Sequence, residues 1–196
     1  MQKIRAGKGV RTPLARSAAP PEGLRKAFEA YSRADLSEAE RLCRAVAASR
    51  PDLFDAWHLL GVIQSGLGQG DKALMSYARA LALRPDSAEA LTNRGAALHD
   101  LGRFGQALEC YEAALTRRPD FVHALTNRGM SFFALKRFGE ALASYDAALA
   151  VQPNYPDALA RRGAVLHELF RFEEALASYD LALALRPADP ETSTTK

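Results

Sequence analysis

The chain contains four histidines and two cysteines, the side chains that most often bind transition metals: His58, His99, His123, His167, Cys43 and Cys110. A metal site needs three or four such ligands close together, and a helix presents two histidines to one ion at a spacing of three or four residues. None of these residues lies that close to another in the sequence. We therefore expect no metal site and no cofactor, and we expect both cysteines to be buried, reduced thiols.

Short glycine-rich and acidic stretches do not form catalytic motifs either. Residues 6–9, AGKG, lack the spacing of a phosphate-binding loop. Residues 66–70, GLGQG, fall in a predicted turn between two helices. Glu173 and Glu174 lie at a predicted helix start, where acidic side chains interact favourably with the helix dipole. We therefore expect no enzymatic activity.

The residues named above lie within or before a series of 34-residue sequence repeats, and this repeat predicts the helices that carry most of them. Four copies align without a gap, namely residues 54–87, 88–121, 122–155 and 156–189. Self-similarity at a fixed period predicts units that stack on their neighbours and share one continuous core. Residues 20–53 form a fifth, degenerate unit, because they keep Ala39 and Pro51 but lack the glycine of the other units. Such a unit is expected of a terminal cap, one face of which meets water.

Each unit is expected to contain two amphipathic helices. In residues 88–121, apolar and small residues recur at intervals of three and four on both sides of Gly102, a residue type that ends helices at low cost. Pro119 cannot continue the second helix, and Asp120 is predicted to cap the next one. The fold class is therefore all-α, an α-solenoid of about five 34-residue helix-turn-helix repeats.

The solenoid is expected to span residues 20–187. A basic disordered leader, residues 1–20, is predicted before it, and a short polar tail, residues 188–196, after it. The leader contains Lys3, Arg5, Lys8, Arg11 and Arg16 and no acidic residue. Removing these five from the 26 basic residues leaves 21 against 23 acidic ones, a net charge of −2 for the rest of the chain.

The helix-turn-helix arrangement also predicts contacts within and between units. Gly95 and Ala107 lie equally far from the turn, so antiparallel helices should bring these small side chains face to face. The second helix of one unit runs antiparallel to the first helix of the next. This predicts two ion pairs between units, Glu112–Arg128 and Asp146–Arg162.

The last predicted helix, residues 175–186, has no following unit in this sequence. Its apolar face is expected to be partly exposed and carries Leu176, Tyr179, Leu183 and Leu185. Exposed apolar faces of this kind mark an interface or a truncated array. We expect either self-association through this face or a chain that belongs to a longer protein.

Seven residues of the 88–121 unit resemble the tetratricopeptide repeat signature: Gly95, Leu98, Phe104, Ala107, Tyr111, Ala114 and Pro119. Their counterparts in the other three complete units do the same, so the resemblance covers residues 54–187 strongly and 20–53 weakly. The family implies a right-handed superhelix whose first helices line a concave groove that binds peptides or protein segments.

The resemblance also implies which residues face this groove. Those expected to contact a ligand are Thr92, Asn93, His99, Thr126, Asn127, Met130, Phe133 and Arg161, with His58, Leu59, Val62, Ala96, His123, Ala164 and His167 at further groove positions. Asn93 and Asn127 share a Leu-Thr-Asn-Arg-Gly context. They resemble the asparagine ladder in the repeat arm of bacterial O-linked N-acetylglucosamine transferase-like proteins, which holds a peptide by its backbone. Leu59 and Arg161 interrupt that ladder.

Other partner classes are disfavoured. A basic leader can contact nucleic acid, but the predicted solenoid lacks interleaved basic and aromatic residues, so a nucleic-acid partner is not expected. No stretch approaches the ~18 apolar residues of a membrane span. Two cysteines without a disulfide pattern favour a cytoplasmic location. An excess of 20 arginines over 6 lysines, together with many alanines, favours a bacterial source.

The expected function is that of a non-enzymatic protein–protein interaction scaffold, which binds a peptide or protein segment in the concave groove. The alternative is the substrate-recognition arm of a larger glycosyltransferase whose catalytic domain is absent from this chain.

Overall fold

The computed structural model describes residues 20–185, which form ten helices and no strand. In chain order they are α1 (Glu22–Ser32), α2 (Leu36–Ser49), α3 (Phe54–Gly66), α4 (Gly70–Leu83), α5 (Ala88–Asp100), α6 (Phe104–Arg117), α7 (Val122–Ala134), α8 (Phe138–Val151), α9 (Pro156–Glu168) and α10 (Phe172–Ala184). Each predicted unit is one helix pair, so the all-α solenoid of helix-turn-helix repeats is confirmed. The predicted leader and tail lie outside the described residues, except for Pro20.

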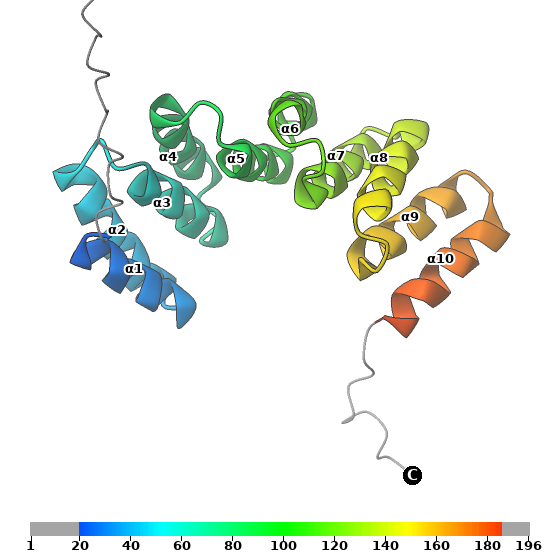
Figure 1. Cartoon of the computed structure of the whole chain (residues 1–196), viewed down its shortest axis with the longest axis horizontal. Coiled ribbons are helices and arrows are strands. Elements are labelled where there is room, and N and C mark those ends of the chain that lie inside the picture. The colour runs from blue at the N-terminus through cyan, green and yellow to red at the C-terminus, as the bar shows by residue number, and fades with distance from the viewer. Residues whose placement is uncertain (1–19, 186–196) are drawn as a thin grey trace, which may run out of the picture.

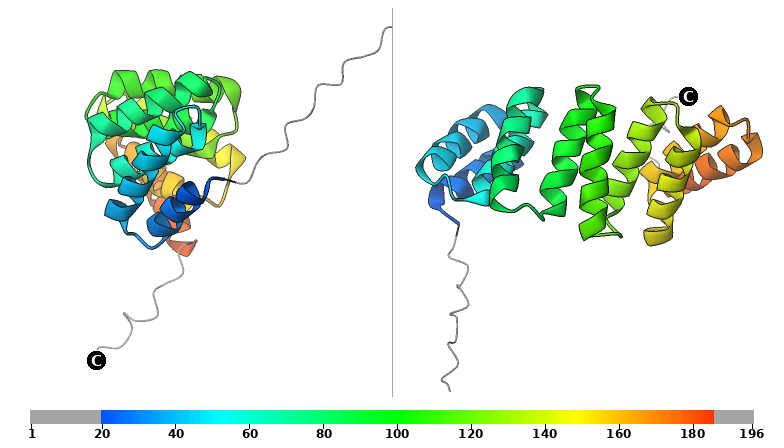
Figure 2. Two further views of the ribbon diagram at one scale, coloured as in Figure 1. Left: turned by 90° about the vertical axis from the view of Figure 1, so that its left-hand side faces the viewer. Right: turned by 90° about the horizontal axis from the view of Figure 1, so that it is seen from above.

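The five helix pairs follow one another in a single curved row (Figures 1 and 2). The first helix of each unit contacts the first helix of the next unit; for example, α3 contacts α5, and α5 contacts α7. Successive second helices, such as α4 and α6, make no such contact within the described residues. The first helices are therefore closer together and line the inside of the curve.

A residue in the left-handed conformation separates the two helices of every unit. The five positions are Ala34, Gly68, Gly102, Lys136 and Phe170, with φ between 57° and 72°. Gly102 thus has the role predicted for it. The same backbone turn holds Lys136 and Phe170, although side chains other than glycine are disfavoured there.

The predicted cap at Asp120 is wrong. Phe121 is the N-cap residue of α7, and no side chain caps that helix. The Pro119-Asp120 pair forms the turn between units, one residue too early to reach the free N–H groups of α7. Ser87, by contrast, directly precedes α5, and its hydroxyl accepts a hydrogen bond from the Ala90 N–H at 3.2 Å.

Each complete unit is closed by a tyrosine ring that packs on a glycine. A Cβ atom placed on Gly95 would lie only 2.5 Å from Cε1 of Tyr111. The same contact recurs as Gly61–Tyr77, Gly129–Tyr145 and Gly163–Tyr179. The predicted close approach at Gly95 therefore involves a residue that was not predicted: the atoms nearest to the glycine belong to the Tyr111 ring, and the predicted partner Ala107 is fully buried in the same unit.

One of the two predicted ion pairs between units is confirmed. Arg162 Nε donates to Asp146 Oδ1 at 2.6 Å, and its Nη1 donates to Ser178 Oγ at 2.7 Å. Arg128 forms no ion pair with Glu112 in the described residues and instead donates to Ser144 Oγ at 3.1 Å. Its guanidinium points to the second helix of its own unit, where burial lowers the pKa of Arg128 and Glu112 partly offsets that effect.

The face of α10 that corresponds to the stacking face of the inner units is apolar and exposed, as predicted. Leu176 and Leu183 are 61% and 68% exposed, whereas the corresponding Leu108 and Leu115 of α6 are 7% and 9% exposed. In the inner units this face is covered by the first helix of the following unit. Within the described residues, α10 has no such neighbour.

The glycine–tyrosine contact predicts opposite effects for two identical substitutions. Gly129→Ala should lower the free energy of unfolding by about 1–3 kcal/mol, because the new methyl group overlaps the Tyr145 ring. Gly139→Ala should be neutral or raise it by up to about 1 kcal/mol, because nothing lies near that Cβ position and alanine favours the helix. Urea unfolding of both variants measures the difference. Equal effects would contradict this account of the packing.

Candidate functional site

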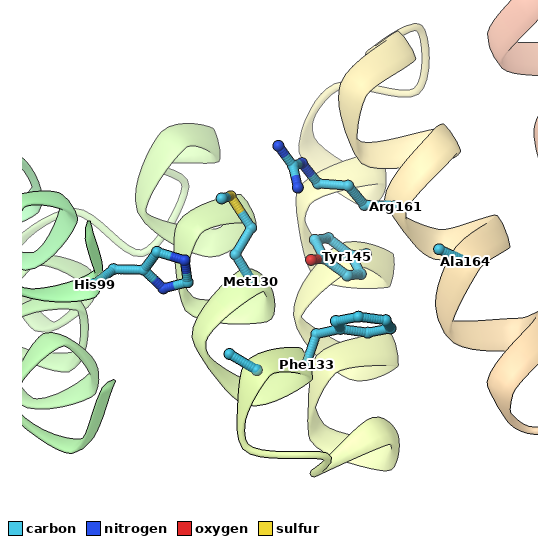
Figure 3. Close-up of a pocket in the computed structure, with 7 residues that line it drawn as sticks. His99, Met130, Phe133, Tyr145, Arg161 and Ala164 are labelled. Carbon is cyan, nitrogen blue, oxygen red and sulfur yellow. The ribbon is translucent and has the colours of Figure 1, made fainter. Parts of the chain in front are cut away.

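A hollow on the inner face brings together side chains from three consecutive first helices. This central hollow has a volume of about 210 Å³ and is lined by His99, Met130, Phe133, Ala134, Tyr145, Arg161 and Ala164. Figure 3 shows His99 of α5 on one side, Arg161 and Ala164 of α9 on the other, and Met130 and Phe133 of α7 between them. The 34-residue period places these residues together, because equivalent positions of stacked units face the same way.

The polar groups of the central hollow are held in defined positions. His99 Nδ1 and Ser131 Oγ lie 2.8 Å apart, which ties α5 to α7, and the His99 ring meets Phe104 edge-on at 5.0 Å. Burial lowers the pKa of His99; the negative charge of Asp100 opposes this shift, and the positive charge of Arg161 adds to it. Burial raises the pKa of Tyr145 to about 12, so its phenol is neutral. The hollow therefore offers an apolar floor, neutral hydrogen-bonding groups and one cation at its rim.

Four of the predicted contact residues line the central hollow: His99, Met130, Phe133 and Arg161. Asn127 is half-buried on α7, one turn before Met130, and makes no side-chain hydrogen bond to any described residue. Asn93 lines a separate hollow of about 180 Å³ together with Val62 and Ala96. Its amide nitrogen lies 3.0 Å from His58 Nε2, so a neighbouring repeat already engages this group.

Thr92 and Thr126 do not face the groove. Both are buried, and the Thr92 hydroxyl donates to the Ala88 carbonyl at 2.8 Å. The Thr126 hydroxyl is buried without a hydrogen-bond partner among the described residues. Each threonine precedes a groove asparagine by one residue, a rotation of about 100° around the helix, which turns it away from the groove surface. Neither side chain is therefore accessible to a ligand in the groove.

A second and larger hollow lies at the start of the array and was not predicted. This N-terminal hollow has a volume of about 510 Å³ and is lined by Pro20, Leu24, Arg25, Phe28, Tyr31, Asp55, His58, Leu59 and Val62. The sequence did contain a signal for it. Phe28 occupies the same place in its unit as Val62 and Met130, so the repeat places it on the groove side of the terminal unit.

Neither hollow contains a recognisable metal site. Within residues 20–185, no three histidine, cysteine or acidic side chains gather closely enough to hold a metal ion. Both cysteines are buried free thiols, and burial raises the pKa of Cys43 to about 12. None of the helices in the described part of the chain is long and apolar enough to cross a membrane.

The environment of His58 predicts a pH dependence of stability. Burial lowers the pKa of His58 below its ordinary value, although Asp55 and Glu89 act in the opposite direction. The unfolded chain therefore binds more protons than the folded one as the pH falls below about 6.5, and the free energy of unfolding should fall with it. His58→Gln should flatten this dependence between about pH 7 and 5, as measured by urea unfolding.

The control is His123→Gln, which replaces an exposed histidine of α7. It should leave the pH dependence close to that of the wild type. An identical pH dependence for His58→Gln and the wild type would refute the assignment to His58.

Known families and structures agree with this architecture. Tetratricopeptide repeat models match residues 88–121 and 126–190, and a further TPR repeat model matches residues 66–102. No curated protein matches the chain in sequence. The resemblance to glycosyltransferase repeat arms stays a prediction.

Solved structures share the fold at low sequence identity. MamA 41-end from Desulfovibrio magneticus RS-1 is 17% identical with a TM-score of 0.75, over 88% of this chain and 96% of that one. Pseudomonas aeruginosa PilF is 20% identical with a TM-score of 0.77, over 87% and 78%. A thermophilic TPR protein of Thermus thermophilus is 24% identical with a TM-score of 0.72, over 86% and 92%. The three repeat models together match residues 66–121 and 126–190, more than half of the chain, and the chain therefore belongs to the tetratricopeptide repeat family.

Proposed function

We propose that this chain is a non-enzymatic scaffold of the bacterial cytoplasm that binds an extended segment of another protein in its concave groove. One observation carries the proposal: His99, Met130, Phe133 and Arg161 from three successive first helices line a single hollow. Membership of the tetratricopeptide repeat family supports the part of the proposal that concerns a protein partner, because proteins of this family generally bind other proteins.

The chemistry of the central hollow suits an apolar side chain of the bound segment. Met130 adapts its shape to different ligands, and Phe133 provides a large apolar surface supported by Phe138 at 5.5 Å. Burying one aliphatic or aromatic side chain there would contribute about 1.5–3 kcal/mol. The side-chain amide of Asn127 can both donate to and accept from the backbone of the segment.

The glycosyltransferase-arm alternative has less support. It rests on a ladder of asparagines, and the amide of Asn93 is engaged by His58 at 3.0 Å. Only Asn127 is left to act in this way, and one rung does not hold an extended backbone in register.

Peptides selected from a random library on the immobilised wild-type protein test the groove proposal. The selected peptides should share an apolar residue, and Met130→Ser should weaken their Kd at least 10-fold, about 1.4 kcal/mol. Met75→Ser is the matched control, because Met75 is exposed on the second helix α4 and should leave Kd unchanged. If the two substitutions change Kd equally, or if neither changes it, the binding surface lies elsewhere.

We also propose that two copies associate through the exposed face of α10. Leu176 and Leu183 belong to the surface that inner units use for stacking. The opposite end of the array is polar, with Glu22 and Lys26 exposed as an ion pair at 2.7 Å. Stacking α1 on α10 would place Glu22 where Ala158 is fully buried, so pairing of α10 with α10 of a second copy is favoured.

Sedimentation equilibrium tests this association. The wild type should be dimeric at about 100 µM, and Leu176→Ser/Leu183→Ser should be monomeric at the same concentration because the contact loses its apolar surface. Leu83→Ser, at the partly exposed last residue of α4, should leave the dimer intact. A wild-type protein that stays monomeric at that concentration would rule out the proposed contact.

A further inference from the structure

The N-terminal hollow has the properties of a binding site for an apolar side chain. Its walls come from Leu24, Phe28, Tyr31, Leu59 and Val62, and its volume of about 510 Å³ exceeds that of the central hollow. Phe28 is 59% exposed there. An aromatic ring exposed within a concave apolar surface is typical of a site that a ligand covers.

The rim of this hollow favours a basic ligand. Asp55 lines it and is held only loosely by Arg84, at 3.7 Å with both side chains more than half exposed. Arg25, a basic residue of the lining, is engaged by Glu29 at 2.6 Å. Of the two charged side chains Asp55 and Arg25 at the rim, the Asp55 carboxylate is therefore the one that is more available to pair with a charged group of a ligand, and this group must be a cation.

The chain itself carries a segment with this chemistry. Pro20 lines the hollow and directly follows residues 1–19, which lie outside the described residues. The first aliphatic side chain larger than alanine before Pro20 is Leu14, and Arg11 and Arg16 flank it. Six residues span at most about 20 Å, which is enough to return Leu14 to the hollow.

We propose that the N-terminal hollow binds a leucine side chain flanked by arginines, and that Leu14 of the same chain is its occupant. Arg11 or Arg16 then lies near Asp55. A short tether gives an attached ligand an effective concentration in the millimolar range, so even a contact with millimolar affinity is populated. An external segment that uses the same hollow must displace the leader. The inference is independent of the proposed partner site, because it concerns a different hollow and a ligand of known sequence.

Two readouts on the full chain test the proposal. The neutral dye Nile red should bind Leu14→Ser with at least threefold higher fluorescence than the wild type, because the hollow becomes free. The methyl NMR signals of Leu59 and Val62 should shift in the same variant. Ile4→Ser, the same kind of change farther from Pro20, is the matched control and should do neither.

A second substitution locates the effect. In a Phe28→Ser background, which removes one wall of the hollow, Leu14→Ser should change neither the dye fluorescence nor the methyl signals. Phe28 is mostly exposed, so this variant should keep the fold. Unchanged signals in Leu14→Ser would overturn the proposal, as would an unaltered response in the Phe28→Ser background. Leu14-dependent shifts that disappear on dilution from about 500 to 20 µM would assign the occupant to a second copy and overturn docking within one chain.

Discussion

The contact of a tyrosine ring with a glycine backbone sets the distance between the two helices of each complete unit. The rings of Tyr77, Tyr111 and Tyr145 are almost fully buried, and a single added methyl group at the opposing glycine would overlap them. Burial raises the pKa of Tyr77 to about 12, so the phenol stays neutral. Because the helix pairs are held this closely, the first helices of successive units can meet along the inside of the curve and form the groove.

The degenerate first unit keeps the same packing with different residues. Ala27 occupies the place of the glycine and Cys43 that of the tyrosine, and both are fully buried. A larger residue on one helix is thus matched by a smaller one on the other, which preserves the close approach. This substitution leaves no tyrosine on the second helix of that unit, while the aromatic rings of Phe28 and Tyr31 on the first helix line the N-terminal hollow.

Periodicity predicted the helices and their stacking, but it did not predict side-chain direction. Counting from the turn correctly identified Gly95 as a point of close approach and paired it with the small residue Ala107, but it did not identify Tyr111, whose ring atoms lie nearest to the glycine. Side chains on a helix lean toward its N-terminus, so the long Tyr111 side chain reaches back over the glycine. The same limitation explains Arg128, whose guanidinium turns to Ser144 rather than to Glu112. The prediction of groove residues was wrong at Thr92 and Thr126. Each lies one residue away from a groove position, and this step turns its side chain into the contact between neighbouring helices.

The repeat separates the residues that maintain the fold from those that give each part of the groove its chemistry. Alanine and tyrosine recur on the second helices at the packing positions, as in Ala107 and Tyr111 or Ala141 and Tyr145. The groove positions of the first helices carry unlike residues at the same places in the unit: one series is Arg25, Leu59, Asn93, Asn127 and Arg161, and another is Phe28, Val62, Ala96, Met130 and Ala164. Since these side chains are not needed to close a unit, they can differ without disturbing the helix pairs. One scaffold can therefore present an apolar hollow with an acidic rim at Asp55 and another with a basic rim at Arg161.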